Sequence, residues 1–328
     1  MIRKALLIGL MCLAGATAAG AAGVAPPGLT LYHQISGGEE GYLVEKPVNI
    51  GRVALERGMR WELVARQNKL AKPYRLKKGM TLKIDNTHIL PTDISNGIVI
   101  NLPELNLYYF KDGVYQRRYA LAVGKPSWPT PTGNFTICEK RKNPTWNVPE
   151  SIQEEMDEQG LDVVEQVPPG PRNPLGKYWM GTTASGVGIH ATNRPWSVGY
   201  YVSHGCIRML PDEIAKLFPE IKVGTPVKIL YRPIKMALTD QGRIYLEAHP
   251  NIYGRKMEPL ALVKETARKN QLEDKIDWDR VPKILKAREG IARDITKEPP
   301  PPKATTTAAP APQEMRLFPL QEKEAKLE

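Results

Sequence analysis

Short β-rich runs fill the stretch from residue 97 to residue 123, and they restrict the possible fold more than any other feature of the chain. The runs 97–102, 105–110 and 114–123 are rich in Val, Ile, Leu and Tyr. Lys111-Asp112-Gly113 separates the second run from the third, and an Asp-Gly pair between two apolar runs is typical of a hairpin turn. This part of the chain is therefore expected to form antiparallel strands.

The pattern of short strands continues further along the chain. We expect a strand around Ile189 and another over 226–231. Residues 211–218 read as a helix, because acidic side chains in their first turn match the helix dipole. Many short strands with few helices predict a mostly β domain.

One hexapeptide, Ser203-His204-Gly205-Cys206-Ile207-Arg208, brings a thiol, an imidazole and a cation together, and His190 lies upstream of it. A cysteine becomes a nucleophile when nearby imidazole and backbone donors favour its thiolate. The N–H groups of a Gly-Cys turn can stabilise the oxyanion that forms when such a thiolate attacks a carbonyl. The motif therefore indicates acyl-transfer chemistry, with His190 arriving from a neighbouring strand.

This arrangement resembles the catalytic domain of the L,D-transpeptidases, the YkuD family, whose signature is a His followed at about this distance by Ser/Thr-His-Gly-Cys. The matching residues are 188–193 and 203–209, and similar segments occur at 129–135, 143–146 and 169–176. The resemblance implies a YkuD-type β-sandwich with the cysteine in a cleft under a loop. We place this catalytic domain at residues 96–231.

The resemblance also implies a role for each residue of the motif. Cys206 would attack the carbonyl between the third residue, a diamino acid, and the terminal D-alanine of a peptidoglycan stem tetrapeptide. His190 would act as the base, oriented by the backbone carbonyl of Ala191, and the N–H groups of Gly205 and Cys206 would form the oxyanion hole. His204 either takes part at the site by holding the loop or is a plain structural histidine.

Further residues are candidates for substrate binding. Arg208 could hold a carboxylate of the stem, or it could form a salt bridge within the fold. Ser203 is expected to hydrogen-bond within the turn. Asn193 and Tyr178 flank the motif and could line the cleft, although an aromatic side chain there could equally belong to the core.

The segment 142–180 is rich in Pro, Gly and acidic residues and has no strong periodicity apart from a possible short helix at 151–157. A loop of this length inside a compact domain is often a functional lid. We expect it to cover the substrate, the alternative being an ordinary surface insertion.

Two alternatives to a cysteine acyltransferase are a metal site and a non-catalytic cell-wall-binding protein. His190, His204 and Cys206 offer ligand types that suit zinc, but no fourth ligand is evident, so we expect no metal and no cofactor. The intact Ser-His-Gly-Cys sequence argues against a catalytic domain that has lost its activity.

The N-terminus indicates export. Arg3 and Lys4 precede an apolar run, Ala5–Leu13, and then small residues, so we expect a cleaved signal peptide at 1–21 and a periplasmic protein without a transmembrane segment. The formal charge of +11 loses two units with the signal peptide. A basic exported protein suits the carboxylate-rich cell wall, and export argues against a nucleic-acid partner.

Residues 38–88 resemble a LysM domain, a small βααβ module that binds glycan containing N-acetylglucosamine. The resemblance rests on 61–68 and 74–84, whereas Pro47-Val48-Asn49-Ile50 stands where the family has a Gly-Asp-Thr-Leu turn. This module either binds the glycan of peptidoglycan or only packs against the rest of the chain.

Residues 232–296 form a C-terminal extension, with a strand-like piece at 243–247 and then charged helical sequence. We expect one or two helices that pack on the catalytic domain. Residues 297–328 are rich in Pro, Ala and Thr and are expected to be a disordered tail.

Cysteine usage bears on the redox state. Cys138 lies in an alternating, strand-like run, and we expect it to be a small buried hydrophobe. A Cys138–Cys206 disulfide is the alternative, and it would inhibit the enzyme because Cys206 must be a free thiol to act.

The matched residues do not identify the acyl acceptor. An amine of a second stem would give a 3→3 cross-link, and a lysine of an outer-membrane lipoprotein would give protein attachment. Water would give hydrolysis, which we rank behind the other two outcomes.

Overall fold

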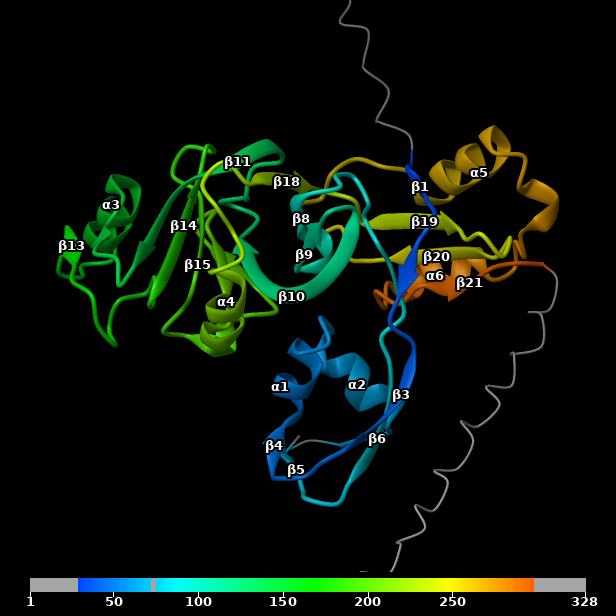
Figure 1. Cartoon of the computed structure of the whole chain (residues 1–328), viewed down its shortest axis with the longest axis horizontal. Helices are drawn as coiled ribbons and strands as arrows, with labels where there is room; N and C mark the ends of the chain where they lie inside the picture. The colour runs from blue at the N-terminus through cyan, green and yellow to red at the C-terminus, as the bar shows by residue number, and fades with distance from the viewer. Residues whose placement is uncertain (1–28, 72–74, 298–328) are drawn as a thin grey trace, which may run out of the picture.

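The computed structural model describes residues 29–71 and 75–297 and shows three parts, each with its own core (Figure 1). In Figure 1 the N-terminal module lies below, the strand-rich part that contains β8 to β18 lies to the left and the C-terminal module lies to the right. The expected signal peptide and all of the expected tail except Lys297 lie outside the described residues.

The central part is built from strands, as the sequence predicts. They are β8 (Gly97–Asn101), β9 (Asn106–Lys111), β10 (Val114–Gly124), β11 (Gly133–Lys142), β14 (Tyr178–Thr182), β15 (Gly188–His190), β16 (Tyr201–Ser203), β17 (Ile207–Met209) and β18 (Pro226–Leu230). Asp112 and Gly113, with φ of 52° and 77°, form the two-residue turn between β9 and β10, which confirms the expected hairpin.

The strands form a sandwich because two long strands belong to both sheets. The first half of β10 pairs with β9, and Leu121 and Ala122 pair with β17. Likewise Gly133–Thr136 of β11 pair with β18, and the rest of β11 pairs with β14. The strand order is β16-β10-β17-β15-β14-β11-β18-β8-β9, and β9 returns to β10, so the two sheets are joined at both edges. The expected mostly β, YkuD-type sandwich is thus confirmed.

The sandwich core lies between the two sheets. It is filled mainly by aliphatic side chains that alternate along the strands, among them Ile98, Ile100, Leu107, Leu121, Val123, Ile137, Ile189, Ile207 and Ile229. Helix α4 (Pro211–Leu217) follows β17 and buries Ile214 and Leu217 in the same core. Asp212 and Glu213 occupy its first turn, as the sequence indicates.

The N-terminal module has the βααβ order expected from the sequence. Strand β3 (Glu39–Leu43), helices α1 (Ile50–Leu55) and α2 (Trp61–Gln67) and strand β6 (Thr81–Asp85) follow one another, and β3 pairs antiparallel with β6. Shorter strands β4 (Val48–Asn49) and β5 (Arg75–Leu76) pair beside them, and β2 (Ile35–Ser36) pairs with β7 (His88–Ile89) where the chain enters and leaves the module. The side chain of Asn49 accepts the N–H of Gly51 at 2.7 Å and caps α1.

The C-terminal extension differs from the expectation. Strands β19 (Ile234–Leu238), β20 (Ile244–Ala248) and β21 (Arg293–Asp294) form a sheet with β1 (Leu31–Tyr32), which comes from the other end of the described chain. Helices α5 (Pro259–Lys269) and α6 (Val281–Ala287) bury Val263, Ala267 and Val281 in the core of this sheet. The expected helices are present, but they pack on a sheet of their own module. Their apolar side chains share one core with those of β19 and β20, and not with the core of the sandwich.

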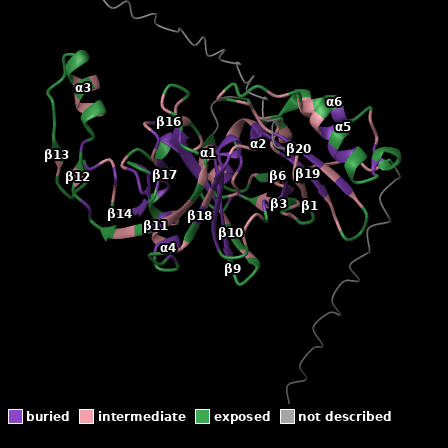
Figure 2. Ribbon diagram, turned by 90° about the horizontal axis from the view of Figure 1, so that it is seen from above, coloured by how far each residue is buried: buried purple, intermediate pink, exposed green. Residues whose placement is uncertain are grey.

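The long segment between β11 and β14 contains a helix close to the expected position. Helix α3 (Glu150–Glu158) lies between β12 (Trp146–Asn147) and β13 (Gln166–Val167), which pair with each other. No residue of α3 is buried, and Figure 2 shows the helix projecting from one end of the molecule. Nowhere in the described residues does a helix have both the length and the apolar character needed to cross a membrane.

The expectation that Cys138 is buried is wrong. Cys138 does lie on β11, but it is exposed, and its neighbour Ile137 takes the inward position in the core. Successive side chains of a strand point to opposite faces, so only one of the two can be buried. Cys138 and Cys206 are both free thiols.

Candidate active site

Cys206 and His190 come from neighbouring strands of the sandwich. Strands β15 and β17 are parallel, with Ile189 beside Ile207 and His190 beside Arg208. Ile189 and Ile207 point into the core, so His190 and Arg208 belong to the opposite face of the sheet. Cys206 directly precedes β17, and strand alternation places it on the same face as His190.

The turn that carries Cys206 is fixed by hydrogen bonds. Ser203 Oγ donates to the carbonyl of Cys206 at 2.5 Å, and Thr130 Oγ1 donates to the carbonyl of Gly205 at 2.8 Å. Gly205 has a φ of 100°, a conformation that side chains rarely tolerate. Ser203 is therefore part of the turn itself, and Thr130 is a contributor that the sequence did not single out.

A tyrosine of the C-terminal module supports Thr130 from the other side. Tyr253 Oη donates to the carbonyl of Gly124 at 2.8 Å and accepts the N–H of Thr130 at 3.2 Å. Gly124 N–H in turn donates to Thr130 Oγ1 at 2.9 Å. The C-terminal module thus reaches the loop that holds Gly205.

The thiol of Cys206 is half-buried. Its Sγ lies 3.4 Å from the carbonyl oxygen of Gly186, to which it donates. Burial raises the pKa of the thiol, and the N–H of Gly188 and the charge of Arg208 act in the opposite direction. A neighbouring base must therefore take the proton before the sulfur can attack efficiently at neutral pH.

His190 is buried and held in one orientation. Its Nδ1 lies 2.5 Å from the carbonyl oxygen of Ala191, so Nδ1 carries the hydrogen and Nε2 is left as the acceptor. Burial and then the charge of Arg208 lower the pKa of His190 to about 4. A neutral imidazole at physiological pH can accept a proton. Within the described residues His190 makes no hydrogen bond to Cys206, as is common before substrate binds.

Arg208 carries a half-buried positive charge. No described residue forms an ion pair with it, and its nearest charged neighbours include Arg194. Burial lowers the pKa of Arg208, and Arg194 adds to this effect. The arrangement differs from the internal salt bridge considered as an alternative, and a bound carboxylate would supply the missing counter-charge.

His204 contacts the segment that we expect to be a lid. Its Nε2 lies 2.6 Å from Glu155 Oε2 on α3 and 3.2 Å from Lys125 Nζ, and Lys125 Nζ lies 3.2 Å from Glu155 Oε1. The ring of Trp128 packs at 4.5 Å from that of His204. Glu155, Lys125 and Trp128 were not singled out from the sequence, where an acidic helix in a long loop gave the only signal.

Comparison with known proteins identifies the family. Residues 95–229 match the family model of the YkuD L,D-transpeptidase catalytic domain. The chain is 31% identical over 233 residues to the probable L,D-transpeptidase ErfK/SrfK of Salmonella typhimurium, covering 67% of this chain and 74% of that protein. This chain belongs to the L,D-transpeptidase family.

Other relatives agree. The probable L,D-transpeptidase YcfS of Escherichia coli is 34% identical over 211 residues, which is 63% of each chain. Among solved structures, the catalytic domain of the E. faecium L,D-transpeptidase is 27% identical, covering 42% of this chain and 99% of that chain with a TM-score of 0.33. The family match and the curated relatives show that the chain is an L,D-transpeptidase enzyme, and its family acts on peptidoglycan.

The remaining candidates occupy different places in this L,D-transpeptidase. Asn193 Nδ2 donates to the carbonyl of Arg172 at 3.0 Å, while its Oδ1 is buried without a partner. Tyr178 packs its ring 4.9 Å from that of Phe218 and contacts the sandwich core. The N–H of Ala191 donates to the carbonyl of Tyr178 at 3.0 Å, and this bond steadies the strand end that carries His190.

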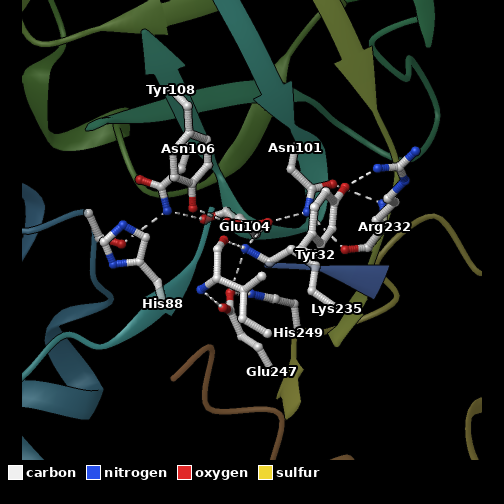
Figure 3. A network of polar contacts seen from close by, with 12 residues as sticks. Tyr32, His88, Asn101, Glu104, Asn106, Tyr108, Arg232, Lys235, Glu247 and His249 are labelled. Atoms are coloured by element: carbon white, nitrogen blue, oxygen red, sulfur yellow. Dashed lines mark hydrogen bonds and ion pairs between the residues drawn. The ribbon is translucent and has the colours of Figure 1, made fainter. Parts of the chain in front are cut away.

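Among the described residues, a group of side chains close enough together to bind a metal ion lies away from Cys206. It consists of Glu104, Glu247 and His249 (Figure 3). The ammonium of Lys235 already lies between the two carboxylates, 2.8 Å from Glu104 Oε1 and 3.0 Å from Glu247 Oε1. This cation occupies the position that a metal ion would need. The cluster is therefore a buried ion-pair network, and the proposed chemistry at Cys206 does not involve it.

The network joins the sandwich to the C-terminal sheet. Lys235 comes from β19 and Glu247 from β20, whereas Glu104 precedes β9 of the sandwich. Tyr108 Oη donates to Glu104 Oε2 at 2.5 Å, and Lys235 Nζ donates to the carbonyl of Ile89 at 2.5 Å. Burial opposes the charge of Glu247, but Lys235 and His249 keep its pKa below the usual range.

Proposed function

We propose that the enzyme works through a thioester at Cys206, formed with the stem tetrapeptide of peptidoglycan. The observation that supports this most is the pairing of β15 with β17, which brings a buried neutral His190 beside the turn that carries Cys206. A raised thiol pKa beside a neutral imidazole that can accept a proton is the arrangement that general-base activation needs.

In the first step, His190 Nε2 takes the proton from Cys206 Sγ, and the sulfur attacks the carbonyl carbon of the third stem residue. The N–H groups of Gly205 and Cys206 stabilise the oxyanion. The C–N bond to the terminal D-alanine then breaks, and the proton on His190 passes to its departing amine. A thioester between Cys206 and the stem remains.

In the second step, an amine attacks the thioester carbonyl while His190 accepts its proton. The C–S bond breaks, the thiol recovers its proton from His190, and an amide forms. An amine from a second stem gives the 3→3 cross-link, and a lysine of an outer-membrane lipoprotein gives attachment of that protein. Water in place of the amine gives hydrolysis, which ranks behind the two transfers.

Arg208 provides the carboxylate-binding group in this proposal. Its guanidinium is half-buried, has no ion-pair partner among the described residues and shares the face of the sheet with His190. A stem carboxylate would form two charge-assisted hydrogen bonds with it. Asn193 and the segment 142–180 would then close over the bound stem.

The proposed site of action is the periplasm, after cleavage of a signal peptide at 1–21. The charge and apolar pattern of these residues support export. The N-terminal βααβ module, whose order of elements is that of a LysM domain, would keep the enzyme near glycan.

Product analysis on purified sacculi tests the proposal. The wild-type chain should release D-alanine from tetrapeptide stems and produce stem dimers joined 3→3, or join stems to a supplied lipoprotein peptide that contains lysine. Cys206→Ala should give neither product. Equal product from both proteins would contradict the proposal.

A further inference from the structure

A cavity of about 850 Å³ lies where the three parts of the chain meet. Its walls come from α1 and the start of α2, from the segments 103–105 and 195–201 of the catalytic region, and from the C-terminal turns 249–252 and 288–290. Cys206, His190 and Arg208 do not line it. It is therefore separate from the cleft in which the proposed chemistry takes place, and its position between modules is common for ligand sites.

Contacts between the modules fix the walls of the cavity. Arg52 of α1 binds both carboxylate oxygens of Asp212 at the start of α4. Leu55 packs against a small core that contains Val198 and Leu210. Asn106 Nδ2 donates to the carbonyl of Gly58 at 3.0 Å. Contacts within the chain therefore hold the walls in place, and a rigid site loses little conformational entropy on binding.

Trp61, Trp196, Tyr200 and Tyr201 are among the residues that line the cavity. Trp196 is 71% exposed and Tyr200 is 46% exposed, which is unusual for side chains of this size. Trp61 Nε1 donates to Tyr200 Oη at 3.3 Å, so the aromatic groups of two modules meet here. Arg60 and Arg288 add hydrogen-bond donors among the lining residues. Flat apolar faces with donors beside them suit a pyranose ring, which has one C–H face and polar edges.

The cavity also lies within reach of the proposed nucleophile. Tyr200 and Tyr201 line its wall, β16 carries the chain about 7 Å from Tyr201 to Ser203, and Ser203 Oγ donates to the carbonyl of Cys206 at 2.5 Å. In the proposed donor, three stem residues separate the glycan from the carbonyl that Cys206 attacks, and three extended residues span about 10 Å. A stem bound at Cys206 therefore has its glycan end at about the distance of this wall.

We propose that this cavity binds the glycan strand of peptidoglycan, a polymer of N-acetylated amino sugars, next to the stem that is being transferred. The inference rests on the proposed function for the identity of the donor. It gives the loop 195–201 a role in selecting stems that are still attached to glycan, since this loop lies between β15, which ends at His190, and β16, which leads into the turn that carries Cys206.

Isothermal titration of the full chain with glycan strands freed of their stems tests the binding directly. We expect saturable binding that Trp196→Ala and Tyr200→Ala each weaken at least tenfold, whereas Trp196→Phe retains most of it. Val223→Ala is the matched control, because Val223 is 62% exposed but lies outside the cavity. Absence of saturable binding by the wild-type chain overturns the proposal. Self-association of the wild type that the cavity variants abolish overturns it too, because a second copy would then be the occupant.

A comparison of two donors separates this inference from the proposed function. We expect Cys206 to be acylated at least tenfold more efficiently by a disaccharide-linked tetrapeptide than by the free tetrapeptide, and this ratio should fall towards one in Trp196→Ala. Equal efficiency of both donors in the wild type overturns the glycan cavity and leaves the thioester mechanism standing. No acylation by either donor contradicts the mechanism, and the titration with stem-free glycan then decides the cavity on its own.

Discussion

Glu155 of α3 places its Oε2 2.6 Å from Nε2 of His204, two residues before the proposed nucleophile. Its other oxygen lies 3.2 Å from Lys125 Nζ, so one carboxylate connects the long loop to both sides of the Cys206 turn. The hydrogen bonds from Lys125 and then His204 lower the pKa of Glu155. These contacts hold α3 over the motif, although the helix buries none of its own residues.

Glu155→Gln should release α3 from this contact, because the amide keeps the shape but loses the charge that binds Lys125. We expect faster amide hydrogen exchange over 150–158 and a threefold to tenfold lower kcat/KM for the stem donor. Glu154→Gln is the matched control, since Glu154 is exposed on the same helix. Exchange that is equally fast in the two variants would show that the contact does not hold the helix.

The charge of Arg208 should set the pH profile of acylation. It lowers the pKa of His190 and also that of Cys206, in both cases as a smaller effect than burial. His190 must be neutral to accept a proton, so the wild-type rate should fall only as the pH approaches about 4. Arg208→Gln should raise the pKa of His190 and move this acid limb to higher pH.

Arg208→Lys is the control for that shift because it keeps the charge at the same position. Its acid limb should stay near that of the wild type even if stem binding weakens, since the ammonium lacks the planar fork of the guanidinium. Rates of Cys206 acylation measured from pH 3 to pH 8 supply the test. An unmoved acid limb in Arg208→Gln would mean that Arg208 does not tune His190.

Lys235→Met should destabilise the junction between the sandwich and the C-terminal sheet. It leaves Glu104 and Glu247 buried without their cation, and removing one partner of a buried ion pair costs about 3–5 kcal/mol. Lys216→Met removes a lysine that is 53% exposed and paired with Glu213, and it should change stability by less than about 0.5 kcal/mol. Urea unfolding of both variants measures the difference, and equal midpoints would contradict the assigned role of Lys235.

Acid should weaken the same junction. The pKa of Glu247 is lower in the folded chain than its unfolded value of about 4.3. Ionised Glu247 therefore stabilises the folded chain fully above that unfolded value, and this contribution is lost as the pH falls through the folded pKa. Thermal unfolding between pH 7 and pH 3 should show this loss in the wild type and a smaller one in Lys235→Met, where the carboxylates have already lost their cation.

The two cysteines should label at different rates. Cys138 is exposed on β11, whereas the pKa of the Cys206 thiol is raised by burial, so Cys138 should react first with a maleimide at pH 7. Cys138→Ser should keep full transpeptidase activity, because Cys138 lies outside the motif. Faster labelling of Cys206 in intact protein would mean that its thiolate is already formed without substrate.

Local patterns sufficed to predict much of this structure. The Asp112-Gly113 turn, the short strands of the sandwich and the order of elements in residues 38–88 all follow from spacing over a few residues. The site motif is equally local, since Ser203 to Arg208 are consecutive. These features could be predicted because turn chemistry and alternation act between close neighbours.

Features that depend on distant partners could not be predicted in the same way. Leu31 pairs with Met236 in a sheet that the isolated C-terminal sequence does not reveal. Glu155 meets His204 because a long loop folds back, and no periodicity in that loop fixes where it ends. The exposure of Cys138 could not be predicted either, since alternation along β11 does not say which face of the strand is covered by the core.

The most direct test of the central claim is intact mass spectrometry of the full chain mixed with a tetrapeptide-bearing muropeptide, beside Cys206→Ala and His190→Ala. The proposed mechanism predicts a transient adduct of the donor less D-alanine on the wild type, none on Cys206→Ala and a strongly slowed adduct on His190→Ala. Peptide mapping should place it on Cys206. An adduct of the same mass on Cys206→Ala, or none on a wild-type chain with a free thiol, would contradict the thioester mechanism.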